Sequence, residues 1–210
     1  VLFRSQQQIV DEVMHAFHRR TTLLVFVQGY GGCGKTWLMR YLLAKIRAEQ
    51  GLATVCASTA LAASNYEKGH TAHELFKIGV LEEDDESPIQ SGIDKHPQRQ
   101  EYLNALNFIC WDEMANQDRE VIELAHEIMN GFESKILVGT GDFRQIAPVV
   151  KYGDRAMVTN ASIKASPLWR HFQVRELTQP MRAWSDPQYA QFTLSVGNGL
   201  FPALIARPEV

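Results

Sequence analysis

The stretch GYGGCGKT, from Gly29 to Thr36, fits the pattern G-x-x-x-x-G-K-[ST] of loops that hold nucleotide phosphates. A β-branched and apolar run of strand length, residues 22–27, comes before it, and residues 37–50 follow it with apolar side chains at helical spacing. The alternative is a chance glycine-rich turn, but a phosphate loop needs a strand before it and a helix after it, and both are here. The sequence therefore predicts that this chain binds a nucleoside triphosphate.

The residue types of the motif suit this chemistry. Glycine lets the backbone curl around a phosphate with its N–H groups pointing inward, and the next helix adds unpaired N–H groups and the positive end of its dipole. Lys35 is placed to reach the β- and γ-phosphates. The hydroxyl of Thr36 is a hard oxygen ligand for Mg²⁺. The motif thus predicts a combined site for phosphates and a magnesium ion.

Length and composition limit what else the chain can be. With 210 residues, 45% of them apolar, it can bury one full core. Its net charge of −3 gives none of the overall basic field that is typical of nucleic-acid-binding domains. The acidic run from Glu82 to Glu86 is expected to be solvated, within a long exposed loop over residues 79–97. Three cysteines without metal-type spacing favour a reducing compartment.

Strand and helix patterns alternate along the chain. We expect helices at 6–19, 37–50, 59–66, 71–76, 98–106, 119–130 and 187–196, and strands at 22–27, 52–57, 107–111, 135–139 and 174–177. Alternation of this kind is typical of an α/β fold with a mostly parallel sheet. Because the strands next to the glycine loop and the acidic pair are nearly continuous apolar runs, helices should cover both faces of the sheet.

A second group of polar residues follows two of these strands. Asp112 ends an apolar strand, and a carboxylate there can bind Mg²⁺ beside the phosphate loop. Glu113, next to it, is suited to polarise a water molecule against the γ-phosphate, which indicates hydrolysis. The alternative is that the pair only caps the next helix. Gln145 could bond both a water and a γ-phosphate oxygen, or it could be a surface residue of a polar turn.

These motifs, in this order, resemble the first motor domain of superfamily-one, RecD-like DNA helicases. The resemblance is closest to the PIF (petite integration frequency) family, which includes the helicase half of Helitron transposases. Its most specific strings are Gly69-His70-Thr71-Ala72-His73 and Gly141-Asp142-Phe143-Arg144-Gln145. The other matching segments are Leu2 with Gln6, Gly29 to Thr36, Ala57 to Ala63, Trp111 to Glu113, Leu177 to Arg182 and Tyr189 to Gly199.

The resemblance assigns roles to single residues. Gln6 matches the glutamine that reads the adenine base, and Arg182 matches the arginine that reaches the γ-phosphate. The implied catalytic residues are Lys35, Glu113, Gln145 and Arg182. The implied nucleotide-binding residues are Gln6, Gly29, Gly31, Gly32, Cys33, Gly34, Lys35 and Thr36, and the implied metal ligands are Thr36 and Asp112. ATP and Mg²⁺ are the cofactors that this set implies.

The resemblance also implies a domain plan and an activity. Residues 1–182 would form a RecA-like P-loop NTPase domain, and residues 183–210 would start the connection towards a missing second motor domain. The chain would hydrolyse ATP to move 5′-to-3′ along single-stranded DNA and to unwind duplexes, in DNA repair, recombination or telomere maintenance. Its partners would be single-stranded DNA and duplex junctions, with no membrane, and it would be a monomer. It would work inside the cell, in the nucleus or mitochondrion, or in the cytoplasm of a bacterium.

Some residues qualify this picture. Segment 57–76 resembles the part that lines the DNA track, which makes Thr59 and Phe76 candidates for DNA contact. Trp111 and Phe143 adjoin strand ends and are expected in the core instead. Pro180 stands where the family usually has asparagine, and its fixed φ could change the backbone that aims Arg182. Two other functions stay open: a non-catalytic ATP-binding remnant of a mobile-element helicase, or another P-loop ATPase.

Overall fold

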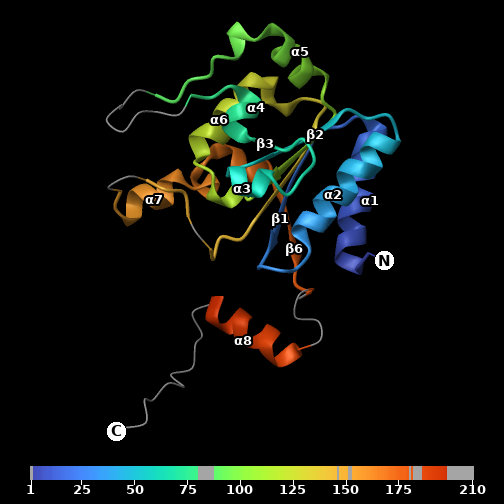
Figure 1. Ribbon diagram of the computed structural model, residues 1–210, viewed down its shortest axis with the longest axis vertical. Coiled ribbons are helices and arrows are strands. Elements are labelled where there is room, and N and C mark those ends of the chain that lie inside the picture. The colour runs from blue at the N-terminus through green and yellow to red at the C-terminus, as the bar shows by residue number, and fades with distance from the viewer. Residues whose placement is uncertain are drawn as a thin grey trace.

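One sheet of six parallel strands, in the order β3-β2-β4-β5-β1-β6, forms the centre of the fold (Figure 1). The structure is a computed structural model, and it describes residues 2–79, 88–145, 147–150, 153–179, 181 and 186–197. The strands are β1 (Leu23–Gly29), β2 (Ala53–Ala57), β3 (His70–Thr71), β4 (Phe108–Asp112), β5 (Ile136–Gly141) and β6 (Gln173–Leu177). The predicted α/β fold with a parallel sheet is confirmed.

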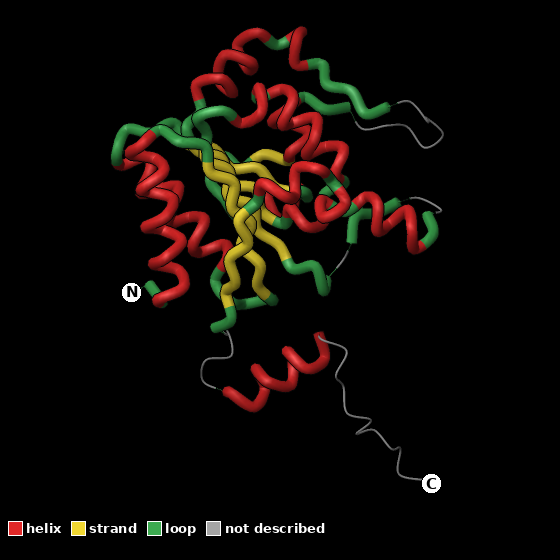
Figure 2. Tube along the Cα trace, turned by 180° about the vertical axis from the view of Figure 1, so that it is seen from behind, coloured by secondary structure: helices red, strands yellow, loops and turns green. Residues whose placement is uncertain are grey.

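Helices cover both faces of this sheet, as Figure 2 shows from behind. The α-helices are α1 (Arg4–Arg19), α2 (Lys35–Ala48), α3 (Ala60–Ala63), α4 (Ala72–Phe76), α5 (Pro97–Ala105), α6 (Arg119–Ile128), α7 (Arg155–Ala161) and α8 (Pro187–Gly197). Short 3₁₀ helices lie at Ile93–Lys95, Met114–Asn116, Asn130–Phe132, Ile163–Ala165 and Pro167–His171. None of the helices in the described ranges is long and apolar enough to span a membrane.

The strands divide their side chains between two cores. In β1, Val25 and Val27 point into a core shared with α1 and α2. Leu24 and Phe26 point to the other face, into a core shared with α4, α5 and α6. Alternate side chains of a strand point to opposite faces, so a strand buried on both sides must be apolar at nearly every position. This explains the continuous apolar runs in the sequence.

The predicted elements appear within a few residues of their expected ends, with three exceptions. The short strand β3 and the helix α7 were not expected from the pattern. Helix α7 has only 7 residues, too few to show a helical period, and a single buried residue, Ala161. The Asp154 side chain caps it by accepting a hydrogen bond from the Met157 N–H at 2.8 Å. The loop expected at 79–97 contains the 3₁₀ helix Ile93–Lys95, and its Ser91 forms a β-bridge with Ile78, the residue just before the loop. The acidic run 82–86 within it lies outside the described residues.

Leu42→Ala in α2 should destabilise the fold strongly. Leu42 is completely buried between α2 and the sheet, and its truncation should lower the free energy of unfolding by about 2–5 kcal/mol. Leu61→Ala in α3 is the matched control, because Leu61 is 81% exposed and should cost less than about 0.5 kcal/mol. Urea unfolding followed by circular dichroism measures both. Equal losses for the two variants would contradict this assignment of the core.

Candidate nucleotide-binding site

The motif residues meet at the edge of the sheet where β1, β4 and β5 end. They line a cavity of about 520 Å³ whose walls come from the glycine loop, the start of α2 and the turns after β4 and β5. Its lining includes Gly31, Gly32, Gly34, Lys35, Thr36, Asp112, Glu113, Asp142, Gln145 and Met181. A larger cavity of about 820 Å³ lies at the opposite, amino ends of the strands and contains none of these residues. The smaller cavity is therefore the candidate site.

The glycine loop has a backbone conformation that is unfavourable for residues other than glycine. Gly34 has φ +88°, in the left-handed region that favours glycine. A side chain on Gly29 would place its Cβ 2.4 Å from the Cys33 Sγ, so the loop closes tightly over its own strand. The ammonium of Lys35 lies inside this loop and donates to the carbonyl oxygens of Gly29 and Tyr30. These are the positions from which a phosphate could be bound.

Two of the predicted nucleotide-binding residues lie behind the loop. The Cys33 side chain is buried in the core beneath α2, and this burial raises the pKa of its thiol, so only its backbone faces the phosphate side. Gln6 is 3% exposed; its Oε1 accepts the Phe3 N–H at 3.1 Å, and its Nε2 lies 2.9 Å from where a Cβ on Gly34 would be. Gln6 thus supports the loop and is not among the residues that line the cavity.

The carboxylate of Asp112 is buried at the end of β4 and receives three hydrogen bonds. Thr140 of β5 donates to its Oδ1 at 2.5 Å, and the hydroxyl of Tyr66 donates to its Oδ2 at 2.5 Å. The N–H of Glu113 donates to Oδ1 at 3.0 Å. Buried carboxylates need such partners, because an unpaired one would lose its hydration without compensation. The bonds also fix the direction in which its oxygens can face a metal ion.

Glu113 is in a different environment from its neighbour. It is half-buried, and its pKa is raised chiefly by desolvation, then by the charge of Asp112, with Lys35 opposing the shift. Its backbone has φ 53°, a left-handed form that is costly for glutamate, and its carbonyl accepts the Ser58 hydroxyl at 2.8 Å. Glu113 precedes the 3₁₀ helix Met114–Asn116 without a side-chain capping bond, so the helix-cap alternative has no support. A carboxylate with a raised pKa suits proton transfer.

Gln145 reaches the cavity from the turn after β5. Its Nε2 donates to Asp142 Oδ2 at 3.3 Å, and its backbone N–H donates to the Asp142 carbonyl at 3.0 Å. Asp142 is itself buried and forms an ion pair with Arg144 at 2.8 Å. Bonds among its own residues therefore stabilise this turn. The side-chain amide of Gln145 lies close to Gly31 of the phosphate loop.

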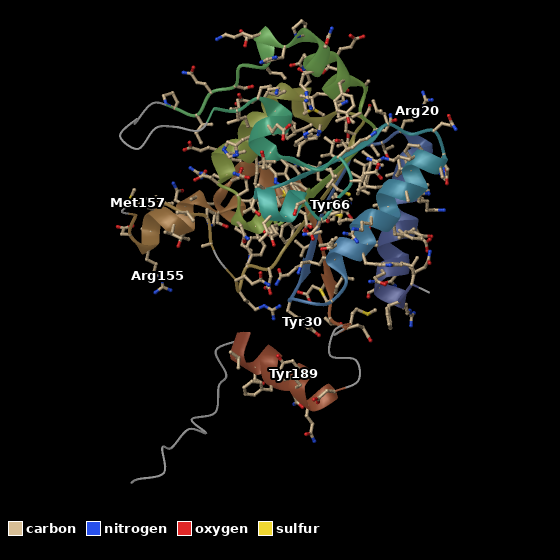
Figure 3. The ribbon with its side chains drawn as sticks, in the orientation of Figure 1. Arg20, Tyr30, Tyr66, Arg155, Met157 and Tyr189 are labelled. Atoms are coloured by element: carbon tan, nitrogen blue, oxygen red, sulfur yellow. The ribbon has the colours of Figure 1, made fainter. Side chains whose placement is uncertain are left out.

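The segment after β6 is attached to the same loop. The N–H of Met181 donates to the Gly32 carbonyl at 2.9 Å, and the hydroxyl of Tyr30 donates to the carbonyl of Thr178. Figure 3 shows Tyr30 at this end of the molecule. Pro180 and Arg182 lie outside the described residues, so the role predicted for Arg182 stays a prediction.

The structure corrects one of the two candidates for DNA contact. Phe76 is completely buried and stacks on Trp111 with ring centroids 5.6 Å apart, so it belongs to the core and cannot touch DNA. Thr59 is exposed, but its hydroxyl caps α3 by accepting the Ala62 N–H at 3.1 Å. Trp111 and Phe143 pack into the core as predicted.

Two contributors to the site were missed in the sequence. Tyr66 and Thr140 hold Asp112, although neither belongs to a motif that binds phosphate or metal. Thr140 had a weak signal, since it is a polar residue at the end of an apolar strand next to the strand of Asp112. Tyr66 had none, because it lies 46 residues from Asp112 in the chain and meets it only in the folded protein.

The oxygen ligands fit magnesium better than a transition metal. Within the described part of the chain, no group of three or more histidine, cysteine, aspartate or glutamate residues could hold a metal ion. A magnesium ion bound with nucleotide needs only one or two protein oxygens, because phosphates and waters supply the others. Thr36 and Asp112 line the same cavity and offer such oxygens. The residues present therefore fit Mg²⁺.

The parallel sheet, the phosphate loop and the two carboxylates at its edge define a RecA-like P-loop NTPase domain. The model of the family described as PIF1-like helicase matches residues 1–202. The chain belongs to this family, which confirms the resemblance seen in the sequence.

Individual relatives agree with the family match. The chain is 29% identical over 179 residues to the ATP-dependent DNA helicase Pif1 of Campylobacter jejuni and 30% identical over 191 residues to ATP-dependent DNA helicase PIF1 of Emericella nidulans. Each alignment covers 81% of this chain, but only 40% and 24% of those proteins. Among solved structures, the Pif1 helicase from Candida albicans has a TM-score of 0.78 at 23% identity, covering 97% of this chain and 45% of that one. The chain thus spans less than half the length of these relatives.

Lys35→Ala should weaken ATP–Mg²⁺ binding by about 10- to 100-fold, because hydrogen bonds from a charged donor contribute roughly 1.5–3 kcal/mol. Titration of this chain with a fluorescent ATP analogue measures the affinity. Lys45→Ala, at the far end of the same helix α2, is the control and should bind normally. Unchanged affinity in a folded Lys35→Ala protein would refute the site.

Glu113→Gln should leave ATP binding intact and reduce hydrolysis by about 10²-fold or more in the full-length gene product, because it keeps the shape and removes the proton acceptor. Asp112→Asn should instead weaken the response to Mg²⁺. Steady-state phosphate release at several Mg²⁺ concentrations separates the two effects, with the exposed Glu120→Gln as control. Normal hydrolysis in both variants would mean that the pair has only a structural role.

Proposed function

We propose that this chain is the nucleotide-binding motor domain of an ATP-dependent DNA helicase. The observation that carries this proposal is the cavity in which Lys35, Thr36, Asp112 and Glu113 meet. Membership of the PIF1-like helicase family supports it, as do the names of the bacterial and fungal relatives. Neighbouring structures include Bacteroides Pif1 bound to single-stranded DNA, with a TM-score of 0.72.

Each residue has a role in the proposed hydrolysis. Lys35 binds the β- and γ-phosphates in place of the loop carbonyls that it bonds in this structure. Thr36 and Asp112 hold Mg²⁺, which neutralises phosphate charge when it is bound. Glu113 accepts the proton of the attacking water, for which its raised pKa suits it. Gln145 senses the γ-phosphate from the turn after β5.

Arg182 and Gln6 complete the proposed site. Arg182 is assigned to the γ-phosphate by its motif, and the backbone of Met181, the residue before it, is bonded to the phosphate loop. Gln6 is assigned to the adenine base by its motif, and its side chain packs against Gly34 of the same loop.

The proposal includes a longer protein. Residues 1–182 would be the first motor domain and residues 183–210, which include α8, the start of the connection to a second one. Figure 1 shows α8 apart from the sheet and its helices. Closing and opening of a cleft between two domains would step the protein 5′-to-3′ along single-stranded DNA and separate duplex junctions. Repair, recombination and telomere maintenance are processes that use such an activity, and transposition is another.

The DNA would pass over segment 57–76, at the end of β2. The segment itself has few permanent cations: from 57 to 77 it contains the lysines Lys68 and Lys77 and no arginine, and both lysines lie outside strands and helices. A DNA-binding protein gains affinity by releasing counterions with its lysines and arginines, so this domain alone should bind DNA weakly. The second motor domain would have to supply the remaining contacts.

Alone, the 210-residue chain should bind ATP but hydrolyse it slowly, because half the cleft around the γ-phosphate is missing and water remains in the site. Its affinity for single-stranded DNA should fall with salt with a logarithmic slope of only about −1 to −2. The full-length gene product should show ATPase activity that rises with added single-stranded DNA. Phosphate-release and DNA-binding assays on both proteins measure these properties.

The two alternative functions predict different results in these assays. Robust turnover of the isolated chain without DNA would indicate another P-loop ATPase. ATP binding without hydrolysis in the full-length protein, with or without DNA, would indicate a non-catalytic remnant.

A further inference from the structure

Tyr66 lies in the turn after α3 and is nearly inaccessible, with 7% of its surface exposed. Figure 3 shows it within the molecule, beside α3. Its hydroxyl donates to Asp112 Oδ2 at 2.5 Å. Asp112 and Thr36 line the candidate site and are the two residues that offer oxygens to Mg²⁺. The phenol therefore holds one of these two residues in place.

The direction of this bond matters for metal binding. Oδ1 of Asp112 already accepts two hydrogen bonds, from Thr140 and from the N–H of Glu113. From the described residues, Oδ2 accepts only the bond from Tyr66, so it keeps a lone pair whose direction the phenol helps to fix.

The ring of Tyr66 is held in place from several sides. The guanidinium of Arg40 on α2 lies 5.8 Å from the ring centroid and also donates to the backbone carbonyl of Asn65. The backbone of Tyr66 donates to Ala63 and accepts from Gly69. A side chain on Gly69 would approach the Ala63 carbonyl to 2.2 Å, so the turn is tightly closed. The hydroxyl is thus presented by a rigid support, as precise ligand orientation requires.

We propose that Tyr66 is a positioning residue for Mg²⁺, which orients the Asp112 carboxylate for the ion. The inference rests on the proposed nucleotide site and adds a determinant of its metal affinity. Residues that hold metal ligands through hydrogen bonds typically change metal affinity by about 10- to 100-fold when they are removed.

The test is Tyr66→Phe in the full-length gene product, with a fluorescent ADP analogue as the probe. Binding is measured in EDTA and as a function of Mg²⁺ concentration. The affinity in EDTA should stay within about twofold of the unaltered protein, while the half-saturating Mg²⁺ concentration should rise about tenfold or more. Tyr102→Phe on α5 is the matched control, since Tyr102 lies beside Arg99 and away from the cavity, and its Mg²⁺ dependence should not change.

Three results would overturn the proposal. Unchanged Mg²⁺ dependence would show that the phenol does not orient the ligand. Equal weakening in EDTA and in Mg²⁺ would indicate a general structural role. A lower half-saturating Mg²⁺ concentration would indicate that the phenol competes with the ion.

The proposed nucleotide site has its own separate test. Lys35→Ala should lose affinity in EDTA as well as in Mg²⁺, unlike Tyr66→Phe. If Tyr66→Phe does not fold, Tyr66→Met removes the same hydroxyl with a flexible apolar side chain, and the same Mg²⁺ shift is expected.

Discussion

The buried carboxylate of Asp112 is the group around which the site is built. A charge at this depth needs hydrogen bonds to replace its lost hydration, and β5, the turn after α3 and its own backbone supply them. The parallel register places Asp112 in the row of strand ends that includes the phosphate loop, one strand away from Thr140. Stability at this end of the sheet and orientation of the proposed metal ligand therefore depend on the same bonds.

The two adjacent carboxylates, Asp112 and Glu113, lie in different environments. Asp112 accepts three hydrogen bonds, whereas Glu113 is half-buried and its pKa is raised mainly by desolvation. The left-handed backbone at Glu113 turns the chain sharply between them. One carboxylate is thereby suited to bind a cation and the other to accept a proton, although they are neighbours in the sequence.

The sequence predicts what depends on local patterns. The strand and helix periods predicted the sheet. The phosphate-loop motif predicted Lys35 and Thr36, because phosphate binding fixes residue types at fixed spacing. Asp112 was predicted from its place at the end of an apolar strand. Prediction failed where tertiary packing decides the position of a side chain. Phe76 is in the core, and Tyr66 meets Asp112 only through tertiary structure. Helix α7 was missed because its 7 residues are too few to show a helical period in the sequence.

The hydrogen bonds that join the glycine loop to the chain after β6 have a mechanical consequence. Gly32 accepts the Met181 N–H, and the Tyr30 hydroxyl donates to Thr178, so the chain leaving the sheet is fastened to the loop at two points. If the loop shifts to admit or release a phosphate group, it must either move the segment after β6 with it or break both bonds. Binding of a phosphate in the loop would thus act mechanically on the segment that leads out of the sheet.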